Sequence, residues 1–154
     1  MHISRLNLLW KIGFLWALSI PALADGTGNI FVSNEADNTV SVIDGKTFEI
    51  IKTIPTGERP RDMRWHNNKN QLLIATSGSD RIEVLDIATL EITGFLEAGE
   101  DPEIFNIDPT GQILVAANED DNEVSVTDLN TGKRIRTIEN VGIEPEGITF
   151  RNDG

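Results

Sequence analysis

The chain repeats itself with a period of about 42 residues, and this repeat limits what it can fold into. The copies cover residues 30–71, 72–112 and 113–154. Asp44, Asp86 and Asp128 hold equivalent places, each 42 residues after the previous one. A fixed period of this length is typical of an array in which one small structural unit packs against the next copy of itself.

Each copy contains the pattern of four short strands. The stretches "TVSVID", "RIEVLD" and "EVSVTD" alternate apolar and polar residues, which is the period of a half-buried strand. Apolar runs such as "LVAAN" precede them, and a third strand follows a turn. A loop with Gly and Pro then leads to a fourth strand, such as "PEIFNID". Four strands in about 42 residues indicate an all-β fold, with each repeat forming one blade of a β-propeller.

The strand after the Gly–Pro loop is expected to be the innermost strand of its blade. The segments concerned are residues 60–66, 102–108 and 145–151. On this assignment the sequence contains two whole four-stranded blades and two partial ones. Because a propeller must close to protect its edge strands, we expect the sequence to be the N-terminal part of a longer protein whose C-terminal region supplies the missing inner strand. A ring assembled from several short chains is the alternative.

The repeat resembles a known family. The unit "VSNEADNTVSVID…TIPTGERP" is similar to the YVTN-type β-propeller repeat of secreted bacterial and archaeal proteins. More narrowly, "ANEDDN" and the pairs Pro102-Glu103 and Pro145-Glu146 resemble propeller proteins associated with PQQ-dependent alcohol catabolism. The resemblance implies an exported, seven-bladed propeller, and it supplies no catalytic residues. The chain departs from the repeat at residues 65–68, "WHNN", where Ser-Pro-Asp-Gly is usual.

Residues 1–24 have the composition of a signal peptide. Arg5 and Lys11 precede the apolar run "IGFLWALSIPALA", which ends in an A-x-A site before Asp25. This run is too short to span a bilayer, so we expect a periplasmic or secreted protein with no membrane contact after cleavage. Cleavage removes two basic residues and no acidic one, which changes the net charge from −12 to −14. Such a charge argues against nucleic acid, and the absence of Cys excludes thiolate chemistry.

Acidic residues gather in two kinds of loop that an antiparallel blade places on one face. The predicted rim consists of Glu100, Asp101, Glu103, Glu119, Asp120, Asp121, Glu144 and Glu146. The spacing does not fit an EF-hand, so we assign no metal ligand and expect no cofactor in this part of the protein. Three interpretations stay open: solvated acids beside structural turns, a Ca²⁺ site made by two loops, and a docking surface for a basic periplasmic protein such as a cytochrome or a quinoprotein dehydrogenase.

Three further groups bear on function. Arg61 and Asp62 lie on the first inner strand and are candidates to face the central channel, although Arg side chains here are expected to pair with Asp62 or with acids of the next blade. His66, the one histidine after residue 24, is expected to face solvent in a hairpin turn. The aspartates that recur in every copy are expected to cap turns. No catalytic residue is identified.

The sequence favours an exported, non-enzymatic binding or accessory propeller associated with periplasmic PQQ-dependent alcohol oxidation. The alternative is a propeller enzyme, either a lactonase-like hydrolase or a haem-d1-type oxidoreductase, whose catalytic residues would lie in other blades. A surface-layer or adhesion module is a third hypothesis. Fold alone does not choose among them.

Overall fold

The structure is a computed structural model that describes residues 28–67 and 69–151. The predicted signal peptide, residues 1–24, lies outside the described residues. Within them the chain forms eleven strands. The strands are β1 (Asn29–Asn34), β2 (Thr39–Asp44), β3 (Ile50–Pro55), β4 (Pro60–Trp65), β5 (Gln71–Thr76), β6 (Arg81–Asp86), β7 (Glu91–Glu97), β8 (Pro102–Ile107), β9 (Ile113–Asn118), β10 (Glu123–Asp128) and β11 (Lys133–Ile138).

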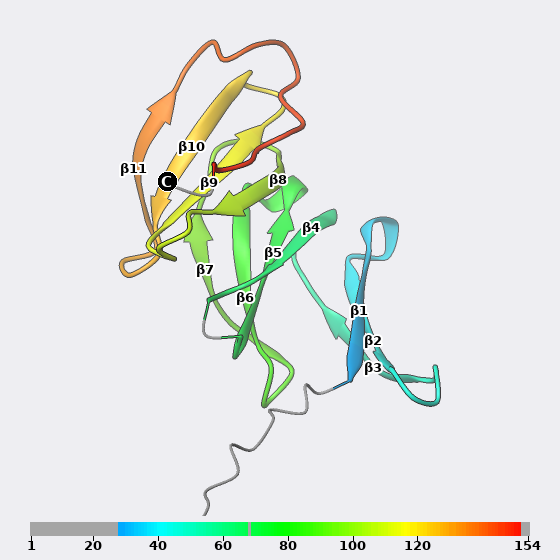
Figure 1. Ribbon diagram of the computed structural model, residues 1–154. Helices are drawn as coiled ribbons and strands as arrows, with labels where there is room; N and C mark the ends of the chain where they lie inside the picture. Colours follow the sequence, from blue (N-terminus) through cyan, green and yellow to red (C-terminus); the bar gives the residue numbers. More distant parts are fainter. Residues whose placement is uncertain (1–27, 68, 152–154) are drawn as a thin grey trace, which may run out of the picture.

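The strands form three antiparallel sheets, and these sheets are the blades that the repeat predicts. The first sheet has the order β1-β2-β3, the second β4-β5-β6-β7 and the third β11-β10-β9-β8. Figure 1 shows them side by side, from the blue and cyan first sheet to the yellow and orange third sheet. The predicted partial β-propeller is therefore confirmed, with two complete four-stranded blades and one three-stranded blade.

The inner strands β4 and β8 contact each other and lie on one side of the array, which we call the channel side. Their positions agree with the predicted inner strands at residues 60–66 and 102–108. The prediction for residues 145–151 is wrong, because this segment is not a strand. It runs beside β8, where the Asn106 side-chain amide donates to the carbonyl of Ile148 at 3.4 Å. The segment forms no ladder with any strand of the described residues, and without a ladder its backbone is irregular.

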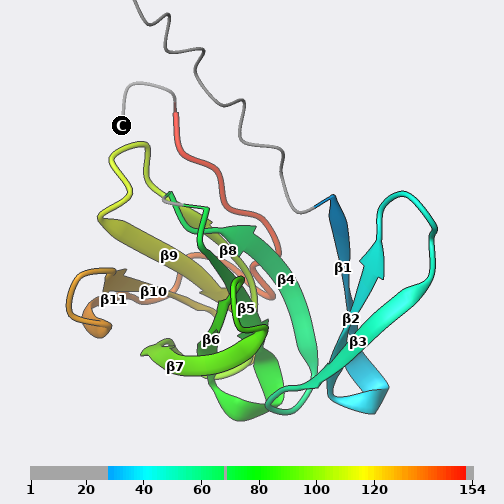
Figure 2. The same cartoon turned by 90° about the horizontal axis from the view of Figure 1, so that it is seen from below.

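The apolar core lies between the sheets. One cluster joins Val40, Val42 and Ile54 of the first sheet to Leu72, Ile74 and Leu85 of the second. A second cluster joins Leu73, Ala75, Ile82 and Leu96 of the second sheet to Phe105, Leu114 and Ala116 of the third. Successive strand residues point to opposite faces, so the second sheet buries one face against each neighbour (Figure 2).

The recurring aspartates at the ends of β2, β6 and β10 hold the turns that follow. The side chains of Asp44, Asp86 and Asp128 accept hydrogen bonds from the backbone N–H groups of the threonines three residues later, at 2.8, 2.8 and 2.9 Å. These bonds lower the pKa of all three carboxyl groups. The predicted turn-capping role is confirmed, and its presence in every blade marks these residues as structural.

Helical structure in the described part of the chain is limited to two 3₁₀ turns, η1 (Glu35–Asp37) and η2 (Ser77–Ser79). They connect the first two strands of the first sheet and the second and third strands of the second sheet. Among residues 28–67 and 69–151 there is no helix long and apolar enough to cross a membrane.

Candidate functional site

Three equivalent loops deliver the charged residues to the channel side. In each repeat a residue with positive φ, namely Asn38, Asp80 or Asn122, ends the connection between two strands. Its side-chain oxygen accepts the backbone N–H of the residue before the loop proline, at 2.9 Å from Arg59, 3.1 Å from Asp101 and 3.0 Å from Glu144. These three residues also have positive φ. The backbone therefore holds Arg59, Asp101 and Glu144 in equivalent places.

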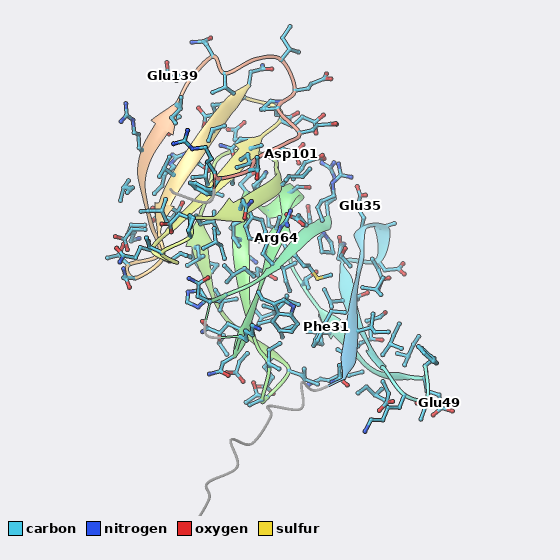
Figure 3. The ribbon with its side chains drawn as sticks, viewed as in Figure 1. Phe31, Glu35, Glu49, Arg64, Asp101 and Glu139 are labelled. Carbon is cyan, nitrogen blue, oxygen red and sulfur yellow. The ribbon has the colours of Figure 1, made fainter. Side chains whose placement is uncertain are left out.

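Arg59 is the centre of a cluster of ion pairs that joins the three sheets. Its guanidinium lies 3.3 Å from Glu35 of the first sheet's loop, 3.2 Å from Asp101 and 3.4 Å from Glu103 at the start of the third sheet. Arg61 pairs with Glu35 at 2.9 Å and also with Glu103. Figure 3 labels Glu35 and Asp101 on either side of the inner strand β4. The expected pairing of these arginines with acids of the next blade is confirmed.

Asp101, Glu103 and Glu119 bring their carboxylate oxygens within 4.8 Å of one another, which is close enough for a shared cation. Asp101 and Glu103 are buried. Buried carboxylates need a compensating charge, and here the two arginines supply it. The structure therefore places guanidinium groups against the acids that the sequence offered as a Ca²⁺ site.

The ion pairs shift the pKa values of Glu35 and Arg59. Hydrogen bonding from Arg59, with the nearby charge of Arg61, lowers the pKa of Glu35. Burial of Arg59 opposes its charge, but Asp101, Glu35 and Asp120 outweigh that effect and raise the pKa of Arg59. The shifts in pKa of Glu35 and Arg59 thus favour the ionised form of both partners of this pair.

A hollow of about 610 Å³ opens on the channel side next to this cluster. Its charged lining comes from Glu35, Arg61, Asp62, Glu103 and Glu146. The two residues predicted to face the channel, Arg61 and Asp62, both line it. Asp62 also accepts a hydrogen bond from Arg64 at 2.9 Å. The hollow thus combines charges of both signs, which come from the connection after β1, from strands β4 and β8, and from the segment after β11.

The predicted acidic rim divides into two places. Asp101, Glu103 and Glu119 meet at the Arg59 cluster, Asp120 is near enough to affect Arg59, and Glu146 lines the channel-side hollow. Glu100 and Asp121 instead line a separate hollow with Glu123, Arg134 and Glu139. Glu144 lines neither hollow, and its backbone N–H donates a hydrogen bond to the side chain of Asn122. The backbone turns at Asp101, whose φ is positive, so Glu100 and Asp101 point to different places.

Two residues behave differently from the sequence-based expectation. His66 is half-buried, and its Nδ1 atom is buried with no hydrogen-bond partner in the described structure, so the prediction that it faces solvent is wrong. Glu35 is not among the predicted rim residues, yet it binds both arginines. The sequence feature that could have identified Glu35 is its place in the repeat, next to the turn that faces Arg59. Trp65 packs edge-on against Phe31 of the first sheet, with ring centres 5.7 Å apart.

The family described as "Lactonase, 7-bladed beta-propeller" matches residues 29–145. The structure is similar to hydrazine synthase of Kuenenia stuttgartiensis, with a TM-score of 0.69 and 19% identity over 86% of this chain and 41% of that chain. It is also similar to the dihydro-heme d1 dehydrogenase NirN in complex with DHE, with a TM-score of 0.62 and 16% identity over 73% of this chain and 24% of that one. The chain thus spans less than half the length of either structure. No curated protein sequence matches it.

Proposed function

This chain belongs to the seven-bladed β-propeller lactonase family, and we propose that it is part of an exported binding or accessory propeller that docks a basic protein at its channel side. The partner proposed is a periplasmic cytochrome or quinoprotein dehydrogenase of PQQ-dependent alcohol oxidation. The predicted export signal, the resemblance to propellers of PQQ-dependent catabolism and the strongly negative charge support this proposal.

The observation that carries the proposal is the change of charge between equivalent loop positions. Arg59 and Arg61 of one loop neutralise Asp101 and Glu103 of the next. The third loop places Glu144 and Glu146 in the same two positions, and among the described residues neither makes a salt bridge.

Both side chains of this third loop are exposed, and Glu146 reaches the hollow that Glu103 also lines. Asp101 and Glu103 bind guanidinium groups within the protein. Glu144 and Glu146 hold the equivalent positions at the surface, where no arginine of the described residues pairs with them. Such a surface favours Lys and Arg of a partner, mainly by raising the association rate.

The test is the association rate between the complete exported protein and a basic c-type cytochrome, measured by surface plasmon resonance at several salt concentrations. Glu144→Gln with Glu146→Gln should lower the rate roughly 2- to 10-fold at low salt, since exposed pairs contribute about 0.2–1 kcal/mol each. The matched control is Glu49→Gln with Glu91→Gln, which removes the same charge from exposed positions on the outer side. Equal losses in both variants would reduce the effect to net charge and contradict a defined docking surface.

A second candidate is an enzyme, favoured by the lactonase family match and by the likeness to a haem d1 dehydrogenase. In this case the charged hollow would be one wall of a substrate pocket that other blades complete. Turnover of a panel of lactones, and the visible spectrum after addition of haem d1, test this candidate on the complete protein. Hydrolysis or a haem-specific spectral shift that Arg61→Met removes would favour the enzyme over the accessory protein.

A further inference from the structure

Glu83 of β6 is a buried carboxylate that lies outside the channel-side site. Its side chain is buried, with the residue only 3% exposed, whereas the equivalent residues of the first and third sheets are Ser41 and Ser125. Charged side chains are rarely buried in this way unless they are paired. The second sheet therefore carries a buried charge at a position where its two neighbours have a small neutral residue.

Glu83 binds both its own sheet and the loop that follows the first one. Its Oε1 atom pairs with Arg81, whose Nη2 atom lies 2.6 Å away. The same guanidinium lies over the ring of Phe95, with 5.4 Å between its central carbon and the ring centre. The other carboxylate oxygen, Oε2, accepts the backbone N–H of Gly57 at 3.0 Å. Glu83 thus connects an anchored cation to the loop after β3.

This loop, residues 56–59, ends in Arg59, the centre of the ion-pair cluster. The backbone N–H of Glu58 donates to the hydroxyl of Ser79 at 2.8 Å. The carbonyl of Arg59 accepts the backbone N–H of Ser77 at 3.0 Å. The loop leaves the first sheet, but the second sheet holds it.

Gly57 is the point where the loop approaches Glu83 most closely. A Cβ atom at this position would lie 2.7 Å from the hydroxyl oxygen of Ser79 and 3.0 Å from Oε1 of Glu83. A side chain at residue 57 would therefore push the loop away from the carboxylate.

The other two sheets use the position of Glu83 differently. The hydroxyl of Ser41 accepts a hydrogen bond from the side-chain amide of Asn34 at 2.9 Å. The hydroxyl of Ser125 donates to the side-chain oxygen of Asn118 at 3.4 Å. Both serines bond within their own sheet, so among the three described sheets the link across an interface at this position belongs to the second sheet.

We infer that the buried charge of Glu83 is a latch, which holds the loop 56–59 and so keeps Arg59 in its cluster. A hydrogen bond to a charged acceptor is roughly twice as strong as one to a neutral acceptor. Loss of this charge therefore loosens the loop, withdraws the guanidinium of Arg59 and leaves more negative charge on the channel side. Glu83 is thus a positioning residue, and the inference does not depend on the proposed docking partner.

The test follows the loop and the cluster separately, by NMR of the complete exported protein. Glu83→Gln keeps the shape of the side chain and removes its charge. Hydrogen exchange of the Gly57 amide should become about fivefold faster, because its acceptor is then neutral. The pKa of the Glu35 carboxyl, which the hydrogen bond from Arg59 lowers, should rise toward its ordinary value.

The direction of the second change identifies its cause. Removal of a negative charge by itself lowers the pKa of any carboxyl group near enough to feel it. A rise in the pKa of Glu35 therefore requires that Arg59 has moved. Among the described residues Glu35 and Glu83 have no contact in common, so a purely structural role of Glu83 would not raise this pKa.

Two further variants complete the test. Glu91→Gln removes the same charge from an exposed position of the second sheet and should change neither quantity. Gly57→Ala pushes the loop from the other side of the latch and should also raise the pKa of Glu35.

An unchanged or lowered pKa of Glu35 in Glu83→Gln overturns the inference, and so does unchanged exchange at Gly57. If Glu83→Gln does not fold, the pKa of Glu35 in Gly57→Ala decides in the same way. If neither variant folds, Glu83 serves the fold alone and the inference is wrong.

Discussion

The guanidinium of Arg59 lies 3.2 Å from the carboxylate of Asp101, the residue that holds the equivalent position one repeat later. The same backbone geometry thus presents a cation in one blade and an anion in the next. Because the two loops are neighbours on the channel side, the change of charge becomes an ion pair between blades.

Removal of Arg59 should destabilise the array. Arg59→Met leaves the buried Asp101 and Glu103 with less compensating charge, and a broken buried pair costs about 3–5 kcal/mol. Arg59 is itself partly exposed, so we expect a smaller loss of about 1–3 kcal/mol in the free energy of unfolding by urea. Arg64→Met, which breaks an exposed pair with Asp62, is the control and should cost less than about 1 kcal/mol.

Removal of both arginines should create a Ca²⁺ site. In Arg59→Met with Arg61→Met, Asp101 and Glu103 lose their guanidinium partners while their oxygens stay clustered with those of Glu119, and Ca²⁺ prefers such oxygen ligands. Addition of Ca²⁺ at millimolar concentration should raise the Tm of this variant relative to EDTA, and further substitution of Glu119→Gln should remove the effect. An equal rise in the unsubstituted protein would show that the metal displaces the arginines.

Asp80 should be replaceable by Asn but not by Ala. Its side chain accepts the backbone N–H of the buried Asp101, and its φ is +53°. Asp80→Ala leaves that N–H without its partner, so unfolding should become easier by about 1–3 kcal/mol. Asn38 and Asn122 make the same bond in the other repeats, so Asp80→Asn should stay within about 0.5 kcal/mol. Similar losses in both variants would mean that the carboxylate charge matters more than the bond.

Two phenylalanines provide a matched test of the core between the blades. Phe105 of β8 is fully buried between the second and third sheets, whereas Phe95 of β7 is mostly exposed. Phe105→Ala should cost about 3–5 kcal/mol of stability, or prevent folding. Phe95→Ala loses its contact with the Arg81 guanidinium and should cost no more than about 1 kcal/mol. Thermal melts of both variants decide whether the sheets depend on this core.

The turn between β8 and β9 should make stability dependent on pH. Burial alone would raise the pKa of Asp108, but hydrogen bonds from the Thr110 hydroxyl and from the backbone of Ile113, Gln112 and Thr110 lower it to about 2. Because the folded-state pKa is lower than that of the unfolded chain, this stabilisation is complete above about pH 5 and is lost as the pH falls toward 2.

Asp108→Asn should therefore cost on the order of 1 kcal/mol at pH 7, after allowance for solvent screening. The difference from the unsubstituted protein should shrink below pH 4, which urea unfolding at pH 7, 4 and 3 measures. A difference that does not change with pH would show that the side-chain bonds, and not the charge, stabilise the turn.

The repeat alone predicted the sheets because alternation and turn chemistry are local properties. The predicted inner strands at residues 60–66 and 102–108 agree with β4 and β8 to within one or two residues. Residues 145–151 have the same pattern but no ladder, because a strand also requires a partner that local sequence does not supply. Pairing of the arginines with acids of the next blade followed from the repeat as well.

The division of the acidic rim could not be predicted in the same way. The loops converge as expected, but the side-chain direction within a loop depends on residues with positive φ, such as Asp101 and Glu144. Each such residue reverses the course of the backbone, so neighbouring acids are sent to different hollows. The half-buried His66 has a similar cause, since its exposure depends on packing around the hairpin turn.

The two faces of each sheet are not alike, and this has a consequence for how blades associate. The second sheet presents Leu72 and Ile74 to the sheet before it, and Leu73 and Ala75 to the sheet after it. Such a contact is heterologous, so it can be propagated in one rotational sense and gives no symmetric face-to-face dimer. Nothing in the contact itself limits the number of units, and the blade count of a closed ring is therefore set by the angle between successive sheets.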